Sequence, residues 1–152
     1  MTRKTLILLA AGGSAALLLG AFGFQYLGYA PCKMCLWQRW PHGAAIVIGA
    51  LALLMPFAIL PLLGALAAAT TGAIGVYHAG VEQKWWQGPT TCTSGDIGGL
   101  STQDLFDQIM AAPLVRCDDI AWAFLGLSMA SWNAIISFAL VAIWITAARA
   151  KA

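Results

Sequence analysis

The sequence predicts an all-α membrane protein, a four-helix transmembrane bundle, and three observations lead to that fold class. Of the 152 residues, 61% are hydrophobic and 9% are charged, too few charged side chains to cover a soluble domain of this size. The mean hydropathy is +0.79. The apolar residues gather in runs close to the roughly 20 residues that a helix needs to cross a bilayer. We expect a single transmembrane domain over residues 1–152, with spans at about 5–29, 35–55, 62–81 and 131–148.

The charged residues predict the orientation of these spans. Arg3 and Lys4 open the chain and Arg149 and Lys151 close it, whereas all six acidic residues lie near positions 80–120. Because basic residues favour the cytoplasmic side of a membrane, both termini are expected in the cytoplasm and the acidic segment outside. An even number of spans follows. No basic run indicates a nucleic-acid partner.

The first span, 5–29, carries no charge. A cleaved signal peptide is the alternative, because Arg3 and Lys4 before an apolar run fit its opening. The apolar part of such a peptide is usually about 7–15 residues long, and this run is much longer. Small residues favour close approach of a neighbouring helix, and four of the glycines in the span suit this role. They are Gly12, Gly13, Gly20 and Gly23.

The second span must begin earlier than its apolar residues suggest. From His42 to Met55 there are about 14 residues, or about 21 Å of helix, too short for a core of about 30 Å. A start near Cys35 supplies the missing length and places Arg39 one turn later on the same face. Pro41 is tolerated near a helix start or as a local kink. Arg39 at this depth either reaches the interface or binds something functional.

The third span follows a predicted cytoplasmic turn at 55–61 and ends near His78 and Glu82. Two interpretations of His78 stay open: a hydrogen-bonding role at the interface with Glu82, or contact with a ligand near the outer face. In the last span Trp132 and Trp144 lie near opposite ends, which is typical of interfacial anchors.

The external loop, about 82–130, contains a second predicted feature besides its cysteines. Ser101 and Asp104 form a helix-capping pattern that precedes Phe106 and Met110, which predicts a short amphipathic helix. Such a helix lies either on the membrane surface or against protein.

All four cysteines are expected at or beyond the outer face, where an oxidising compartment favours disulfides. Three alternatives stay open: two structural disulfides, a zinc site with four thiolate ligands, and a relay between two redox pairs. The two-residue spacing of Cys32 and Cys35 favours exchange, since so small a ring adds little stability. The distant Cys92 and Cys117 lack the paired spacing of zinc ligands. A helix start and Arg39 both favour a Cys35 thiolate, and a thiolate at the bilayer edge needs a bilayer-soluble oxidant such as a quinone.

These residues resemble the DsbB family of disulfide bond formation proteins over essentially the whole chain. The resemblance rests on the two loop cysteines, on the Tyr77-His78 region, on residues 122–127 before the last span, and on one continuous motif. That motif is Pro31-Cys32-Lys33-Met34-Cys35-Leu36-Trp37-Gln38-Arg39. The resemblance implies a multi-pass protein of the bacterial inner membrane that keeps the periplasm oxidising, a role that comes with the family.

The resemblance also implies a role for each cysteine. Cys92 would be attacked by the reduced thioredoxin-fold partner, a periplasmic DsbA-like protein, and Cys117 would be its resolving mate. Cys117 would then attack Cys32, and Cys35 would pass electrons to ubiquinone or menaquinone held near Arg39. His78 is a further candidate for contact with the quinone, and no metal site is expected.

Two other functions remain to be weighed against this one. A vitamin K epoxide reductase-like oxidoreductase is also similar to a four-helix membrane bundle with a CxxC pair on its quinone side. Its loop cysteines are expected before the CxxC span, whereas Cys92 and Cys117 follow it here. A non-enzymatic four-span scaffold would need only structural disulfides and apolar packing.

Overall fold

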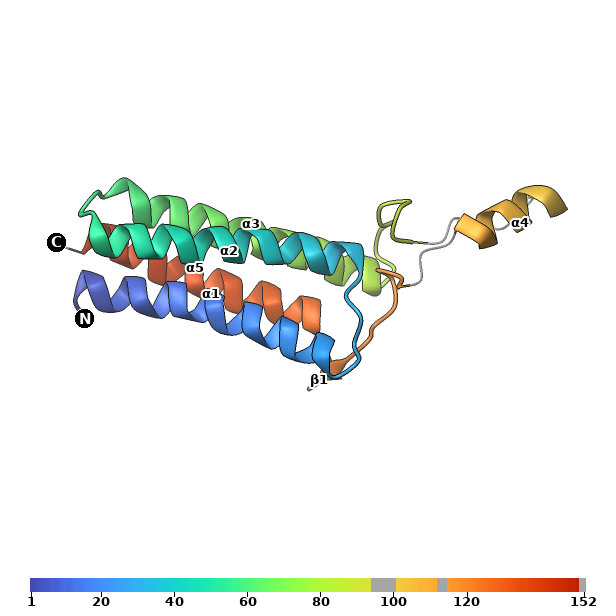
Figure 1. The fold of residues 1–152 in the computed structure, drawn as a ribbon, viewed down its shortest axis with the longest axis horizontal. Helices are drawn as coiled ribbons and strands as arrows, with labels where there is room; N and C mark the ends of the chain where they lie inside the picture. Colours follow the sequence, from blue (N-terminus) through green and yellow to red (C-terminus); the bar gives the residue numbers. More distant parts are fainter. Residues whose placement is uncertain (94–100, 112–114, 151–152) are drawn as a thin grey trace.

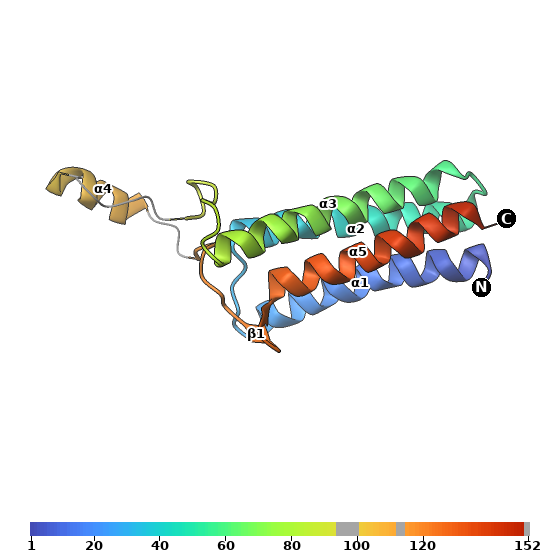
Figure 2. The same ribbon diagram turned by 180° about the vertical axis from the view of Figure 1, so that it is seen from behind.

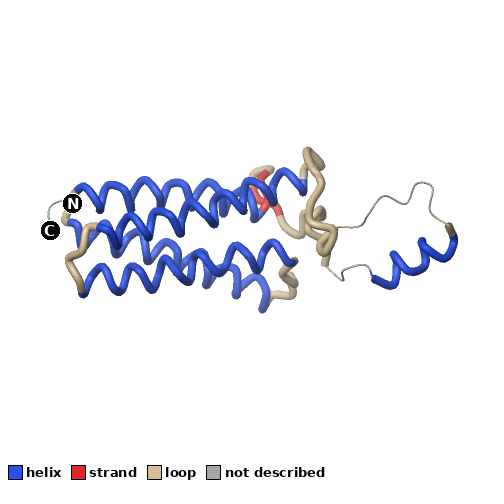
Figure 3. The backbone as a smooth tube through the Cα atoms, turned by 90° about the horizontal axis from the view of Figure 1, so that it is seen from above, coloured by secondary structure: helices blue, strands red, loops and turns tan. Residues whose placement is uncertain are grey.

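The computed structural model describes residues 1–93, 101–111 and 115–150, and it is mostly helical. Four long helices lie side by side, and both termini lie at the same end of them (Figures 1 and 3). A short helix and a two-stranded hairpin belong to the loop at the other end. The elements are α1 (Arg3–Tyr26), α2 (Lys33–Leu54), α3 (Ile59–Glu82), α4 (Thr102–Ala111), β1 (Ala123–Phe124), β2 (Leu127–Ser128) and α5 (Met129–Arg149).

The helices α1, α3 and α5 are long and apolar enough to cross a membrane. The chain is therefore an all-α membrane protein, as predicted. Helix α2 has 22 residues, but Gln38, Arg39 and His42 all lie in its outer half, which makes that half polar. The helix also continues through Pro41. These three polar residues are part of the site described below.

The bundle is built around α3, which packs against α5 on one side and α2 on the other, while α1 closes the bundle against α2 and α5 (Figure 2). Helix α3 begins at Ile59, inside the segment expected as a turn. Pro61 is tolerated there because the first turn of a helix leaves its backbone N–H groups unpaired in any case. The Arg3 guanidinium donates to the carbonyl oxygens of Pro56 (3.2 Å) and Phe57 (2.8 Å), which ties the start of α1 to this turn.

Trp144 is not an interfacial anchor, and that prediction was wrong. Its side chain is fully buried in the core at the end of the bundle near the termini. A Cβ atom placed on Gly64 would lie 2.7 Å from the Trp144 ring, and Gly49 also faces the ring. The absence of side chains on these two glycines makes room for the indole, which a hydropathy pattern along α5 alone does not reveal.

Only one of the glycines in α1 serves close helix packing. A Cβ atom on Gly13 would collide with Leu140 of α5, whereas Gly12, Gly20 and Gly23 meet nothing within 4 Å among the described residues. The tightest backbone approach lies elsewhere, at Gly75 of α3. A Cβ atom there would lie 3.1 Å from the Ala130 carbonyl oxygen on α5. Small residues indicate where helices are able to approach, but not which neighbour they meet.

The β-hairpin leads the chain from the loop into α5. Leu125 (φ 52°) and Gly126 (φ 77°) occupy its turn, and two successive positive φ angles suit the twist of a two-residue hairpin. Ser128 then caps α5 by accepting the Ser131 N–H at 3.2 Å. Helix α4 lies well away from the bundle (Figures 1 and 2).

Candidate thiol–disulfide site

Cys32 and Cys35 lie at the start of α2. Cys32 is the N-cap residue, and its Sγ accepts the Cys35 backbone N–H at 3.2 Å. The Cys32 thiol donates to Cys35 Sγ across 2.8 Å. That hydrogen bond, together with burial, raises the pKa of the Cys32 thiol well above its usual range. In the reduced pair, Cys32 is therefore the residue that keeps its proton, and Cys35 is the acceptor.

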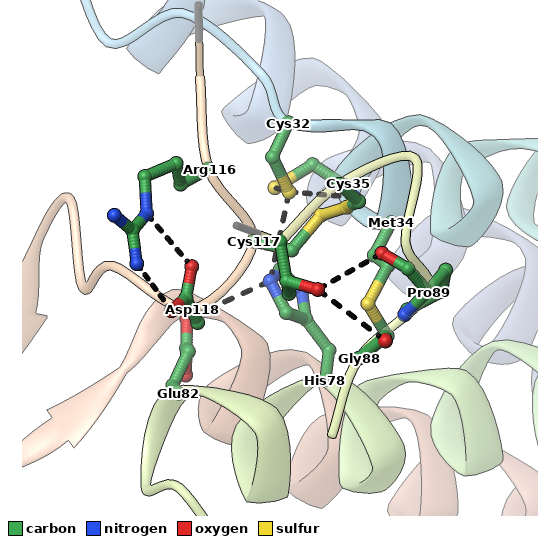
Figure 4. The surroundings of a disulfide bond; sticks show 12 residues. Cys32, Met34, Cys35, His78, Glu82, Gly88, Pro89, Arg116, Cys117 and Asp118 are labelled. Carbon is green, nitrogen blue, oxygen red and sulfur yellow. Dashed lines mark hydrogen bonds and ion pairs between the residues drawn. A yellow bond between two sulfur atoms is a disulfide. The ribbon is translucent and has the colours of Figure 1, made fainter. Parts of the chain in front are cut away.

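The loop cysteines form a disulfide that lies directly against this pair. Cys92 and Cys117 are bonded with their Cα atoms 5.3 Å apart, and both side chains are buried. The Cys117 backbone N–H donates to the Cys92 carbonyl oxygen at 2.7 Å. The sulfurs of Cys32, Cys92 and Cys117 all lie within 4.8 Å of one another. All four predicted cysteines are thus brought to one place, and Cys32 is the member of the CxxC pair that lies against the loop disulfide. Figure 4 shows Cys32 and Cys35 beside Cys117.

An ion-pair network holds the segment that carries Cys117. The Asp118 carboxylate accepts two hydrogen bonds from the Arg116 guanidinium (3.0 and 2.6 Å) and one from the Lys84 ammonium (2.6 Å). Lys84 also donates to the Asp118 carbonyl oxygen at 2.8 Å. Arg116 first, and then Lys84, hold the pKa of the Asp118 carboxyl well below its usual range. Because Lys84 follows α3 directly, the network fastens the loop to the bundle beside Cys117.

His78 lies against the cysteines in the interior of the bundle. It is buried on α3, and its Nε2 lies 3.5 Å from Cys32 Sγ and 3.9 Å from the Glu82 carboxylate. Glu82 in turn accepts a short hydrogen bond from the Ser128 hydroxyl. The structure places His78 next to Cys32 and Glu82, and its contact with a ligand stays a prediction.

A buried polar network continues from His78 toward the middle of the bundle. Gln38 donates from Nε2 to His78 Nδ1 (2.9 Å) and accepts at Oε1 from Asn133 Nδ2 (2.7 Å). Asn133 also contacts Thr71 Oγ1 (3.1 Å) and His42 Nε2 (2.8 Å). The sequence reasoning assigned none of these four residues to the site. The signal was present, since uncharged polar residues inside apolar helices commonly mark functional positions.

A cavity of about 420 Å³ lies beside the cysteines. It is lined mainly by apolar residues of α1, including Leu17 and Phe24, and by Trp122 and Trp132 near the hairpin. A few polar groups converge on it, which is the usual composition of a small-molecule site. The polar and thiol lining comprises Cys32, Cys35, Gln38, Arg39, His42, His78 and Asn133, with Glu82, Arg116 and Asp119 nearer the loop.

Arg39 belongs to the wall of this cavity and is held there by α1. Its guanidinium donates to Gln25 Oε1 (2.7 Å) and to the Ala21 carbonyl oxygen (3.3 Å). It also lies over the Phe22 ring at 4.8 Å. These contacts fix a permanent positive charge at the edge of an apolar site that Cys35 also lines.

A helical membrane bundle with a dithiol pair, an adjoining disulfide and an apolar cavity defines a membrane protein of thiol–disulfide exchange. A family profile described as "Disulfide bond formation protein DsbB" matches residues 3–147. The chain belongs to this DsbB family, and it is a disulfide-forming oxidoreductase of the bacterial inner membrane.

Three relatives named disulfide bond formation protein B illustrate the similarity. That of Azoarcus sp. (strain BH72) is 32% identical, over 94% of this chain and 92% of the relative. That of Pasteurella multocida (strain Pm70) is 31% identical, over 81% and 74%. That of Shewanella sp. (strain MR-4) is 28% identical, over 84% and 77%. No solved structure matches the chain significantly.

Proposed function

We propose that this chain is a membrane thiol:quinone oxidoreductase that reoxidises a periplasmic, DsbA-like thioredoxin-fold protein and passes the electrons to ubiquinone or menaquinone. The net reaction converts a partner dithiol and a quinone into a partner disulfide and a hydroquinone. Two electrons and two protons move, so the reaction is balanced. This activity sustains protein disulfide formation outside the cytoplasm.

The observation that carries the proposal is the position of Cys32, one member of the CxxC pair, directly against the Cys92–Cys117 disulfide. Its sulfur lies within 4.8 Å of both sulfurs of the Cys92–Cys117 disulfide and 2.8 Å from Cys35 Sγ. Thiol–disulfide exchange requires one sulfur to approach another directly. A protein that used both pairs only for stability would have no need to place them against each other.

In the proposed relay, each cysteine takes part in a defined exchange step. A partner thiolate attacks Cys92, and the released Cys117 thiolate attacks Cys32, which frees Cys35 as a thiolate. The second partner thiol then releases the partner disulfide and Cys92. Cys92 re-forms its bond with Cys117 and leaves Cys32 and Cys35 reduced. Closure of the Cys32–Cys35 bond would release two electrons, and a quinone bound in the cavity would accept them.

The cavity fits a quinone by its size, its lining and its neighbours. A bound quinone supplies an acceptor for two electrons and two protons. Cys35 lines the cavity, so electrons leave the protein there, and Arg39 supplies the fixed positive charge that favours an anionic sulfur or ring oxygen. His78 presents Nε2 to Cys32, where it supports proton movement at that sulfur.

The proposed topology has four spans, with α2 added to α1, α3 and α5. Both termini lie at the end of the bundle away from the cysteines (Figure 1). The basic residues at the two termini then face the cytoplasm, and the cysteines face the periplasm. In the structure α4 lies beyond the end of the bundle with Phe106 and Met110 exposed, and we propose that in the membrane it folds back onto the outer surface with these two side chains toward the lipid.

The vitamin K epoxide reductase-like alternative and the scaffold alternative predict different behaviour. The order of the cysteine pairs along the chain favours the DsbB-type relay, and the family assignment agrees with it. A scaffold would leave a quinone unreduced in the presence of any dithiol. Purified protein supplied with a reduced thioredoxin-fold partner and a short-chain ubiquinone should reduce the quinone.

The decisive experiment traps the partner. In Cys117→Ser, Cys92 has lost its disulfide mate and is a free thiol, so it is first activated as a mixed disulfide with thionitrobenzoate. The thioredoxin-fold partner is supplied with only its attacking cysteine, whose thiolate displaces thionitrobenzoate and stays bonded to Cys92 because no second thiol can release it. Mass spectrometry then locates the bond. Cys35→Ser should abolish quinone reduction while the trapped complex still forms. Unchanged turnover of the Cys35→Ser protein would refute the relay, and a partner attached only to Cys32 would reverse the assigned order.

A further inference from the structure

His42 carries a buried nitrogen atom that the bundle leaves without a partner. The side chain is 3% exposed, and its Nε2 is bonded to Asn133 Oδ1 at 2.8 Å. Within the described part of the chain, Nδ1 has no hydrogen-bond partner. His42 also lines the cavity beside Cys35. A buried polar atom without a partner is costly, and such an atom on a residue that lines a cavity indicates a ligand that completes it.

The surrounding hydrogen bonds determine which kind of group Nδ1 can bind. The Met34 carbonyl oxygen can only accept, and the Gln38 amide lies 3.2 Å from it, so the Gln38 nitrogen must point there. Gln38 Oε1 is then the atom facing Asn133, which must present its own nitrogen to it. Asn133 Oδ1 is therefore the atom that faces His42. Because this oxygen can only accept a hydrogen bond, His42 Nε2 must carry the proton. A neutral His42 therefore presents a bare lone pair at Nδ1.

The same chain gives His78 the opposite arrangement. Because Gln38 Nε2 donates to His78 Nδ1, a neutral His78 carries its proton on Nε2, which faces Cys32. One network thus orients two histidines differently. His78 offers an N–H to the thiol pair, whereas His42, which lines the cavity, holds an unpaired acceptor at its buried Nδ1.

We infer that His42 Nδ1 is a contact for the hydroxyl group of the reduced quinone, so that the cavity binds the hydroquinone in preference to the quinone. This inference rests on the proposed function and adds a residue that determines which redox state of the ring is favoured. A quinone oxygen can only accept, and Nδ1 of a neutral His42 has nothing to donate to it. A hydroquinone hydroxyl donates to the lone pair and satisfies it.

Preferential binding of the reduced ring has a consequence for electron transfer. By linkage, a site that binds the hydroquinone tenfold more tightly than the quinone makes reduction of the bound ring tenfold more favourable. His42 and Cys35 lie on the same face of α2, two turns or about 10 Å apart. The preference is thus located in the same cavity as the thiolate that delivers the electrons.

The test compares both forms of one ligand on the full chain in lipid nanodiscs. Dissociation constants are measured by calorimetry for ubiquinone-1 and, without oxygen, for its hydroquinone, with both disulfides of the protein formed. The key variant is His42→Gln, whose terminal amide retains a donor for Asn133 but has no group at the Nδ1 position. Val47→Ala, at an exposed position of the same helix, is the matched control. Nitrogen-15 NMR of labelled histidine follows Nδ1 of the unmodified protein.

We expect His42→Gln to weaken hydroquinone binding about tenfold, the usual effect of one lost hydrogen bond, and to leave quinone binding within about twofold. The Nδ1 resonance should move on addition of the hydroquinone and stay in place with the quinone. Equal effects on both forms, no effect on either, or an unmoved resonance would overturn the inference. If His42→Gln does not fold, the resonance in the unmodified protein decides the question.

The failure of this inference is separable from that of the proposed function. Suppose that the unmodified protein binds and reduces ubiquinone-1, but His42→Gln leaves hydroquinone binding unchanged and the Nδ1 resonance does not move. In that case only the inference fails. If neither form of the ring binds to the unmodified protein, the proposed function fails with it.

Discussion

Asp118→Asn should slow exchange between the loop disulfide and Cys32. The Asp118 carboxylate accepts from both Arg116 and Lys84, and these bonds fasten the segment that carries Cys117 to the end of α3. Asparagine keeps the size of the side chain but removes its charge. The segment then opens more often, and Cys117 spends less time within reach of Cys32.

The size of the effect follows from the exposure of the three partners. The Asp118 side chain is 12% exposed, whereas Arg116 is 39% and Lys84 is 60% exposed, so solvent screens the two cations. Exposed ion pairs contribute about 0.2–1 kcal/mol each, and the pair of bonds from Arg116 belongs at the upper end. The total is about 1–2 kcal/mol, which makes local opening about 5–30-fold more frequent.

Two measurements test this prediction. Hydrogen exchange of the Cys117 amide, which donates to Cys92, should accelerate about 5–30-fold in Asp118→Asn. The rate at which Cys117 becomes linked to Cys32 should fall when reduced partner is added without quinone. Asp119→Asn is the control, because that carboxylate is 67% exposed and 3.5 Å from Arg116. Equal rates for Asp118→Asn and the unmodified chain, or equal effects of the two variants, would refute the reasoning.

The pH dependence of the same network has a definite sign. Because the folded-state pKa of Asp118 is depressed, its contribution is complete above the unfolded value of about 3.9 and is lost as the pH falls through the lower folded value. Amide exchange rates corrected for intrinsic pH effects should therefore be constant between pH 7 and 5. A loss of protection in that range would show that another group controls the loop.

Three further predictions concern other parts of the molecule. Arg39→Met should raise the quinone concentration needed for half-maximal turnover about tenfold while partner trapping is unchanged, and equal activity at limiting quinone would contradict its role. In the reduced protein at pH 8, iodoacetamide should label Cys35 well before Cys32, whose raised pKa keeps it protonated; mass spectrometry of peptides distinguishes the two. Gly64→Ala should destabilise the bundle by about 1–3 kcal/mol in denaturant titration because the new methyl group collides with Trp144, and Trp144→Phe should partly restore stability.

The membrane class and the location of the thiol chemistry could be predicted from the sequence because both depend on local patterns. Hydropathy and charge indicate where α1, α3 and α5 lie along the chain. The length of the second apolar run requires a helix that includes Cys35. These are properties of one segment at a time, and the bilayer makes them strict. Because every backbone N–H and C=O group inside the bilayer must be hydrogen-bonded within the protein, a hydrophobic run has few alternatives to a helix.

The contacts between helices could not be predicted in the same way. The position of Trp144 near one end of α5 suggests an interfacial anchor. The side chain is nevertheless buried, because two glycines on other helices leave room for its ring. The network of Gln38, Asn133 and His42 joins residues far apart in the chain, and its hydrogen bonds depend on helix rotation. A polar residue in an apolar run indicates that a partner is needed, but the identity of the partner follows only from the fold.

The Asp118 network affects the two loop cysteines differently. It holds the residue next to Cys117, on the side where the chain returns to the bundle. When the loop disulfide opens, Cys117 stays tethered beside Cys32 at a high effective concentration, and the attack within the protein remains a reaction between close neighbours. Cys92 lies on the other arm of the loop, and in the proposed relay it is the sulfur that becomes bonded to the partner. In the proposed relay, the loop thus presents one sulfur to the partner while it keeps the other beside Cys32.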